Sequence, residues 1–533
     1  MNKTNPVWSS MGYELPEGYA AAPALLRVTI IRRDTDLDFD AVVVGSGAGG
    51  GAVADELAAA GMSVGVIESG CGMQSPDFRP NEDVGRRLFQ DQAMTATRDL
   101  GVGILSGATL GGGTTVNWGT SLVLPDHIRE EWADLSGCRF FTEESFERAF
   151  DAVKKRLSVG LDESVVNRNN AKLRDGCEAL GYRWCVLPRN SRGCDPAFCG
   201  YCTFGCSRNA KQSSAVTFLR EAQKRGATVI TNCRATRVMI DGGRVAGVEA
   251  VATDPETGRR HTVQVRAPVV VVAAGALNTP VLLMRSGLTL RALGQNLFLH
   301  PTAVVAGTYE GEEILPWVGP PQSIMSDEFA EVSGNYGFRL ETAPAHPGLI
   351  ASALPWFDAQ DHRSRMQRLA RTSFIIALVR DRAAGRVRAG RGGRPVIEYS
   401  PGKLERELLR RGVQEAARVH WAAGAREILS PHTRKHCFRR TSESRAAFDE
   451  FCSRLAGEPV DHNWMAIYSA HQMGTARMGS SARDAVCNAE GEVFGVKNLF
   501  VADASAFPAS AGVNPMLTIM ALAKHTAQCI NAR

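Results

Sequence analysis

The sequence lacks the features that mark membrane and secreted proteins. Among its 533 residues there is no apolar run of about 18 residues, so we predict no membrane-spanning helix. The opening residues, MNKTNPVWSS, have no apolar segment of the kind that a signal peptide carries. We therefore expect a cytoplasmic protein.

A strong charge of one sign is also missing. The 61 Lys and Arg residues and 56 Asp and Glu residues leave a net charge of +5, which gives no reason to expect a nucleic-acid partner. Thirteen cysteines in a chain without a secretion signal argue against a disulfide scaffold. With 44% hydrophobic and 22% charged residues, the composition is that of a globular protein, and its length suggests about two to four domains.

The most informative pattern lies in residues 40–57, DAVVVGSGAGGGAVADEL. A short β-branched run precedes Gly45, Gly47 and Gly50 in the order G-x-G-x-x-G, and an Ala-rich helical segment follows. These glycines allow a tight turn, a close approach by a pyrophosphate, and packing of the helix on the strand. A second apolar strand ends in Glu68, which is placed to accept a hydrogen bond from a ribose. The sequence therefore predicts a dinucleotide-binding unit.

Two later regions also have glycine-rich patterns that indicate cofactor binding. Residues 100–121, which include Gly112 and Asn117, are rich in glycine and predict a backbone that approaches a ligand closely. Residues 266–287 repeat the order of buried strand, glycine turn and helix, which suggests a second approach to the same cofactor. Asp503 ends another apolar strand, where it could accept a hydrogen bond from a ribityl hydroxyl or a phosphate-bound water.

Four cysteines form a cluster with the spacing C-x4-C-x2-C-x3-C: Cys194, Cys199, Cys202 and Cys206. Three interpretations remain open at this stage. The cluster is a structural loop of reduced or disulfide-linked cysteines, an iron–sulfur centre that relays electrons, or a zinc site.

The C-terminal part contains the residues best suited to chemistry. His471 ends a short apolar segment and is followed by a glycine turn. Asn514 precedes Pro515, which is expected to start a helix, so the positive end of that helix faces Asn514. His300 precedes Pro301 at the crossover into the second domain, where we expect a structural role rather than a catalytic one.

We predict an α/β protein with an α+β second domain. After a lead-in of residues 1–37, a Rossmann-like nucleotide-binding domain covers 38–300 and contains the cysteine-rich insert 185–212. A substrate domain built on a mainly antiparallel sheet covers 301–455. Residues 456–533 return to the first domain and bring the His and Asn to the site.

With these pieces in place, the chain resembles the glucose–methanol–choline (GMC) oxidoreductase family. The matching segments, in the family's order, are GSGAGG with Glu68, GATLGGGTTVNWG, GALNTPVLLMRSG, HQMGTARMG and GVNPMLTIMALA. Within the family the chain is most similar to long-chain (fatty) alcohol oxidases and dehydrogenases, through CGYCTFGCSRNAKQSS, GQNLFLHP and the GVNP segment. The resemblance implies FAD, a two-domain fold and oxidation of an alcohol CH–OH to an aldehyde or ketone.

The resemblance also implies roles for single residues. His471 is the expected active-site base, and Asn514 is its partner. The three glycines of the first motif and Glu68 are expected to bind the ADP half of FAD. The other expected cofactor-binding residues are Gly112, Asn117, Asp503 and, through its backbone at the adenine, Val238.

Several features narrow this expectation. Val116 stands where some family members carry a flavin-linked His, so we expect non-covalent FAD. The expected partners are a small-molecule alcohol and either dioxygen or another electron acceptor. Two alternatives remain: a tailoring oxidase for a hydroxyl of an amino sugar, terpenoid or sterol, and a dehydrogenase that passes electrons through the cysteine cluster.

Overall fold

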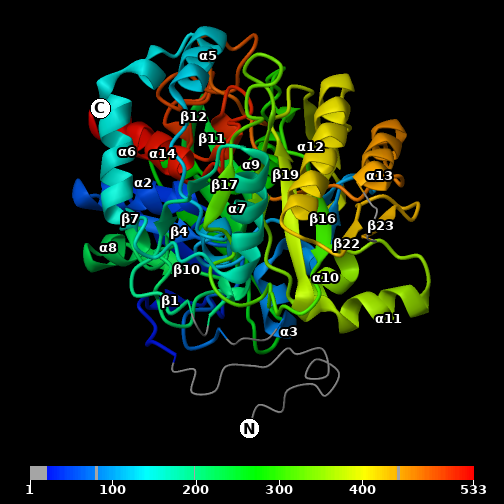
Figure 1. Ribbon diagram of the computed structural model, residues 1–533. Coiled ribbons are helices and arrows are strands. Elements are labelled where there is room, and N and C mark those ends of the chain that lie inside the picture. Colours follow the sequence, from blue (N-terminus) through cyan, green and yellow to red (C-terminus); the bar gives the residue numbers. More distant parts are fainter. Residues whose placement is uncertain (1–20, 79–81, 197–198, 441–444) are drawn as a thin grey trace.

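A computed structural model describes residues 21–78, 82–196, 199–440 and 445–533 and contains two large sheets with helices packed around them (Figure 1). The first sheet has six strands, all parallel, in the order β1-β10-β4-β3-β14-β25. Both β3 and β4 are buried at every position, as expected for a parallel sheet covered on both faces. The strands are β1 (Val28–Thr29), β3 (Ala41–Val44), β4 (Val64–Ile67), β10 (Thr228–Ile230), β14 (Val269–Val272) and β25 (Leu499–Val501).

Helix α2 (Ala48–Ala59) follows the central strand β3 and packs against α14 (Met516–Asn531) and α8 (Phe218–Lys224). The turn between β3 and α2 requires glycine. Gly45 has a φ of +103°, and a Cβ atom at Gly50 would lie 1.9 Å from the Gly45 carbonyl oxygen. The predicted strand–turn–helix unit is confirmed, and its C-terminal partner α14 comes from the far end of the chain.

A smaller sheet, in the order β11-β12-β13-β2, extends this domain. Its strands are β11 (Cys233–Asp241), β12 (Arg244–Thr253), β13 (Arg260–Arg266) and β2 (Thr35–Asp38). The described part of the predicted irregular lead-in therefore contains β1 and most of β2, which join two different sheets. The short polar strand TDLD has no apolar alternation, so its pairing with β13 had no signal in the sequence.

The second large sheet is mainly antiparallel, as predicted, and follows the order β5-β6-β24-β16-β19-β18-β17-β8. In addition, β22 pairs with β16, and β23 pairs with β22. Its strands are β5 (Thr95–Ala96), β6 (Gly103–Ile104), β8 (Cys185–Val186), β16 (Thr302–Thr308), β17 (Ile324–Ser326), β18 (Phe338–Thr342), β19 (Thr372–Val379), β22 (Glu427–Leu429), β23 (Cys437–Arg439) and β24 (Tyr468–Ser469). One face carries apolar residues that pack with α12 (Lys403–Ala422) and α7 (Arg168–Leu180).

The strands of this sheet come from both sides of the domain boundaries predicted at residues 301 and 456. Strands β5, β6 and β8 precede residue 301, and β24 follows residue 456. Strands of two residues are too short to show a hydrophobic period, so only the strands beside them in space reveal which sheet they join. No helix within the described parts of the chain is long and apolar enough to cross a membrane.

The remaining elements surround the two sheets. The helices are α3 (Glu82–Gly85), α4 (Gly113–Val116), α5 (Asp126–Ser136), α6 (Glu144–Arg156), α9 (Gly275–Arg285), α10 (Pro347–Ala353), α11 (Ala359–Gln367) and α13 (Arg445–Gly457). The strands are β7 (Val159–Gly160), β9 (Arg189–Asn190), β15 (Gln295–Leu297), β20 (Gly385–Ala389) and β21 (Pro395–Glu398).

The contact at Gly50 gives a test of the first domain. Because the new Cβ atom would meet a backbone oxygen, Gly50→Ala must push α2 away from β3, and we expect a loss of at least ~2 kcal/mol of unfolding free energy. Gly160→Ala is the control, since a Cβ there meets nothing within 4 Å. Thermal unfolding of both variants measures the difference. Equal melting temperatures would contradict this account of the turn.

Candidate active site

Glu68 follows β4, and its carboxylate reaches the turn between β3 and α2. It accepts hydrogen bonds from the Ser46 backbone N–H (3.0 Å), from Ser46 Oγ (2.6 Å) and from the Gly70 N–H (2.7 Å). The Gly111 N–H donates to Ser46 Oγ (2.9 Å) and so ties the second glycine-rich segment to the same turn. The predicted acid and the predicted phosphate loop therefore meet at the N-terminus of α2, where free N–H groups favour an anion.

Gly47 and Gly112 lie against each other where these two segments meet. A Cβ atom on Gly112, whose φ is +53°, would lie 2.9 Å from the Gly47 Cα atom. The result is a cradle of bare backbone beside the helix N-terminus, which is what a pyrophosphate requires.

Asn117 follows this cradle and has an unsatisfied atom. Its Oδ1 is buried without a hydrogen-bond partner among the described residues, while its Nδ2 donates to Met516 Sδ at 3.1 Å. A buried amide oxygen without a donor is costly, so the position fits a bound group that carries an N–H. The arrangement is consistent with the predicted contact between Asn117 and the flavin ring.

Two other predicted cofactor contacts have partners within the protein. The Asp503 carboxylate accepts hydrogen bonds from the N–H groups of Ser505 (2.7 Å) and Gly275 (2.8 Å) and from Thr279 Oγ1 (2.6 Å), so it joins the end of β25 to the start of α9. The Val238 N–H donates to Ser286 Oγ at 2.8 Å. That amide is not free for adenine, and the structure gives the Val238 prediction no support.

His471 follows β24 and contacts a residue to which the sequence had assigned a structural role. Its Nδ1 lies 3.1 Å from Nδ1 of His300, and the Gly512 N–H donates to Nε2 of His300 at 2.9 Å. Gly512 is two residues before Asn514. A single chain of hydrogen bonds thus links the strand end that carries His471 to the loop that carries Asn514. Burial lowers the pKa of His471 to about 4, so the ring is neutral at neutral pH.

Glu341 is a functional candidate that sequence reasoning missed. It lies on β18, its Oε2 accepts from Gln322 Nε2 at 2.6 Å, and its buried Oε1 has no partner at standard geometry within the described chain. Burial raises its pKa to about 7, against the lowering effects of the adjacent Asn514 side chain and of the Arg339 guanidinium. The sequence gives no clear signal for it, because the strand FRLET alternates apolar and charged residues and Glu341 takes one of the charged positions.

The loop before Asn514 is held from the second domain. Asp381 accepts hydrogen bonds from the Leu299 N–H (2.7 Å), Ser510 Oγ (2.7 Å), the Tyr399 hydroxyl (3.1 Å) and the His300 N–H (3.3 Å). Two buried arginines reinforce this, since Arg380 donates to the Ser510 carbonyl at 3.1 Å and Arg339 donates to the Gly512 carbonyl. The loop has little freedom to move against the sheet.

The sheet face that carries Glu341 also carries Arg339, two residues earlier on β18, and is apolar from Glu341 across β19 to the middle of β16. Glu341 pairs with Ile376, and Ile376 pairs with Val304, so the three side chains share one face. Two residues further along the strands, Phe374 and Ala306 pair on the same face. Val304, Phe374 and Ala306 all line a pocket.

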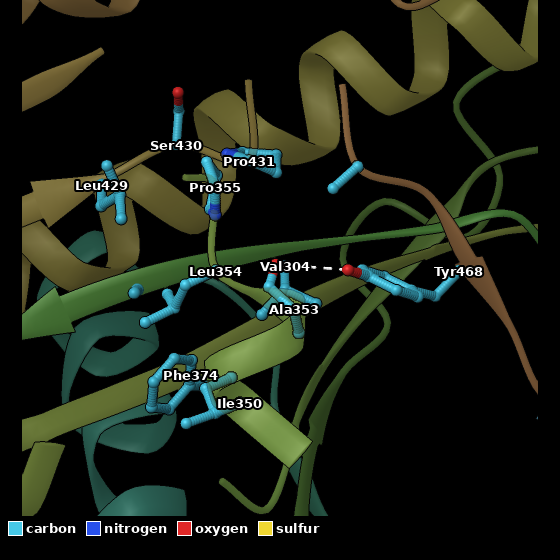
Figure 2. Close-up of a pocket in the computed structure, with 12 residues that line it drawn as sticks. Val304, Ile350, Ala353, Leu354, Pro355, Phe374, Leu429, Ser430, Pro431 and Tyr468 are labelled. Carbon is cyan, nitrogen blue, oxygen red and sulfur yellow. Dashed lines mark hydrogen bonds between the residues drawn. The ribbon is translucent and has the colours of Figure 1, made fainter. Parts of the chain in front are cut away.

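Figure 2 shows that Tyr468, Leu354 and Pro355 also line this pocket. The Tyr468 hydroxyl donates to the Ala353 carbonyl at 3.2 Å. Most of the lining is hydrocarbon, which suits an apolar ligand. Tyr468 is three residues before His471, so the pocket and the predicted base are close in the chain.

The four clustered cysteines do not form a metal site in this structure. No group of three or more His, Cys, Asp or Glu residues in the described part of the chain is arranged to hold a metal ion. Lys211 instead anchors the loop, since its buried Nζ donates to the carbonyls of Thr115 (2.6 Å), Asn117 (2.8 Å) and Cys202 (2.8 Å). The arrangement favours the structural-loop interpretation over the iron–sulfur and zinc interpretations.

Metal analysis of the purified protein tests this assignment. We expect far less than one iron or zinc per chain, together with titration of all thirteen cysteines as free thiols after denaturation. Stoichiometric iron that disappears in Cys202→Ser would contradict the structural-loop interpretation.

Comparisons with known proteins identify the family. Models described as GMC oxidoreductase match residues 66–302 and 381–523. Long-chain-alcohol oxidase FAO4A of Arabidopsis thaliana is 35% identical over 494 residues, which cover 91% of this chain and 67% of that protein. A cholesterol oxidase of Acinetobacter baumannii is 24% identical over 93% of this chain and 95% of that protein.

Solved structures share the fold. Pyridoxine 4-oxidase from Mesorbium loti has a TM-score of 0.66 at 20% identity over 93% of this chain and 99% of that one. An Aspergillus oryzae formate oxidase, solved to examine FAD modification, has a TM-score of 0.66 at 17% identity, covering 93% and 98% of the two chains. On its sequence matches and its fold, the chain belongs to the GMC oxidoreductase family.

Proposed function

We propose that the substrate of this FAD-dependent alcohol-oxidising enzyme is a long aliphatic alcohol, which is converted to its aldehyde. The observation that carries this proposal is the apolar sheet face that runs from Glu341, beside Asn514, to the pocket lined by Val304 and Ala306. Several relatives named long-chain-alcohol oxidases, at 33–35% identity, support the same substrate class. An apolar wall disfavours an amino sugar.

The chain has a suitable place for FAD. The bare backbone at Gly47 and Gly112 would hold the pyrophosphate, and the unsatisfied Asn117 Oδ1 would accept from the flavin ring. FAD, when bound, supplies the acceptor for the hydride that leaves the alcohol carbon. We expect it to be non-covalent, with Val116 in place of a linking His.

The alcohol hydroxyl is held between His471 and Asn514. Asn514 precedes α14, and its buried Oδ1 has no partner among the residues that the structure describes. Loss of hydride from the carbon must be matched by loss of the hydroxyl proton to a base. Two groups compete for that role: His471, as predicted from the sequence, and Glu341, which the structure adds.

The electron acceptor and the location are further parts of the proposal. Dioxygen or another acceptor reoxidises the enzyme, and no arrangement of the four cysteines supports an electron relay through them. The cytoplasmic location expected from the sequence stays a prediction.

Replacement of His471 tests the placement of the reaction. Because His471→Ala removes the ring that contacts the hydroxyl, turnover should fall by about 10²–10⁴-fold. The visible flavin spectrum should persist, since the residues proposed to hold FAD lie on other segments. Stopped-flow reduction by alcohol under anaerobic conditions measures both effects. Near-normal flavin reduction would refute the assignment.

A chain-length series tests the proposed path of the substrate. Ala306→Leu narrows the pocket, so kcat/KM for a C16 alcohol should fall by roughly tenfold while that for a C6 alcohol stays near the parent value, since about 1.4 kcal/mol corresponds to tenfold. Ala359→Leu, at an exposed position, is the control. Equal losses of kcat/KM for the C6 and C16 alcohols would mean that the hydrocarbon tail of the substrate does not lie in this pocket.

A further inference from the structure

Three arginines gather around the turn at Gly393, between β20 and β21. Arg234, near the start of β11, donates from its Nη2 to the Gly393 carbonyl at 2.5 Å. The guanidinium of Arg285, the last residue of α9, lies against the same glycine, because a Cβ atom there would overlap its Nη1. Arg394 is the next residue along the chain. We call these three side chains the arginine cluster.

The arginine cluster is exposed and has no neutralising partner. Within the parts of the chain that the structure describes, none of its members forms a salt bridge with an acid. Burial lowers the pKa of Arg234, and the positive charges of Arg285 and Arg394 lower it further, while Asp91 acts weakly in the opposite direction. Like charges held this close repel one another, so the cluster favours an anion from outside the chain.

The positive surface continues along the hairpin formed by β20 and β21. Arg386 and Arg388 both pair with Glu398, and Arg98 donates to the same carboxylate at 3.3 Å. Three guanidiniums therefore share one acid. Arg391, on the turn of this hairpin, is also exposed.

Exposed apolar side chains lie beside these arginines, on the hairpin formed by β5 and β6. Met94 is 74% exposed and Leu100 is 75% exposed, more than any other large apolar side chain among the described residues. The Arg98 N–H donates to the Ile397 carbonyl at 2.7 Å and so fixes this hairpin against β21. Leu100 has a φ of +61°, which is rare for leucine. Water thus faces an apolar tip on a strained backbone, next to a basic surface.

The β5–β6 hairpin also contacts the pocket proposed for the alcohol. A Cβ atom on Gly103, in β6, would lie 2.9 Å from Cδ1 of Tyr468, so the hairpin packs on that ring. Tyr468 lines the pocket, as does Pro355 (Figure 2). Trp356, the residue after Pro355, is 64% exposed. The basic and apolar surface is therefore adjacent to elements that line the pocket.

We propose that the arginine cluster and the β5–β6 hairpin together dock on the surface of an anionic phospholipid bilayer, from which the alcohol enters the pocket. This inference rests on the proposed long-chain substrate, which dissolves in a bilayer. Guanidiniums bind the anionic headgroups, while Met94 and Leu100 insert between them. An acidic protein could also meet the arginines, but protruding apolar side chains beside an apolar pocket favour the lipid.

Co-sedimentation of the FAD-loaded enzyme with vesicles tests the electrostatic part. We expect binding to equimolar phosphatidylcholine and phosphatidylserine, weaker binding at high salt, and little binding to phosphatidylcholine alone. Arg285→Gln/Arg394→Gln should weaken binding about 30-fold, since each basic side chain near an anionic surface contributes roughly fivefold. The control is Arg139→Gln/Arg220→Gln, at exposed positions on η3 (Arg139–Thr142) and α8. Equal losses in the two double variants would overturn the proposal.

A second pair of variants tests the apolar part. Leu100→Asn removes the exposed side chain and suits the positive φ, so the hairpin keeps its conformation. Its affinity for the anionic vesicles should fall about tenfold. Leu135→Asn is the control, because Leu135 is 57% exposed on α5, another part of the fold. A parent enzyme that stays off anionic vesicles would overturn the proposal and leave the arginine cluster to an acidic protein.

Kinetics separate this docking from the proposed function. With a C16 alcohol carried in anionic vesicles, Arg285→Gln/Arg394→Gln should lose about tenfold in turnover at low lipid concentration, while the same alcohol delivered from cyclodextrin should react at the parent rate. Equal losses with both carriers would contradict a docking role. A parent enzyme that binds anionic vesicles but oxidises no aliphatic alcohol from either carrier would refute the proposed substrate and leave the docking surface intact.

Discussion

The buried carboxylate of Asp381 joins the parts of the chain on which the proposed site depends. It binds the backbone before Pro301, where the chain enters the second domain, and the Ser510 hydroxyl of the loop that returns to the first. Tyr399 supplies a further donor from beyond the hairpin formed by β20 and β21. A buried acid is tolerable only with such a set of donors. Its hydrogen bonds join the two domains beside His300, which contacts both His471 and the Gly512 backbone.

Much of the cofactor half could be predicted because its constraints are local. Gly45 has a φ of +103°, and Gly50 lies where the helix packs against a backbone oxygen. Both positions require glycine regardless of the rest of the chain, so both could be predicted from the sequence. The same holds for Glu68, which follows directly from the end of β4. These residues are close together in the sequence, and Ser46 links them through its hydrogen bonds to Glu68.

The proposed catalytic residues were harder to predict from the sequence, because their contacts join segments that are far apart in the chain. His300 and His471 are 171 positions apart, and nothing near either one predicts their contact. Glu341 sits on a strand where alternation alone would place its side chain toward solvent, yet the C-terminal loop covers it. The cysteine spacing resembled a metal motif, whereas the buried Lys211 shows that the loop is held by carbonyl contacts. The spacing of the cysteines shows that thiols are available as ligands, but only the surrounding fold shows whether they are arranged to bind a metal.

The order of strands in the two large sheets has a consequence for how the protein folds. The second sheet combines β5 near residue 95 with β24 near residue 468, and the first sheet is completed by β25 near residue 500. Contacts with such large sequence separation slow folding, because loop closure must precede the favourable pairings. The second sheet cannot be completed before β24 has been synthesised, and the first cannot be completed before β25. The apolar strands made earlier must therefore avoid aggregation until these late strands have been synthesised, and exposed strands of this kind are the usual clients of chaperones.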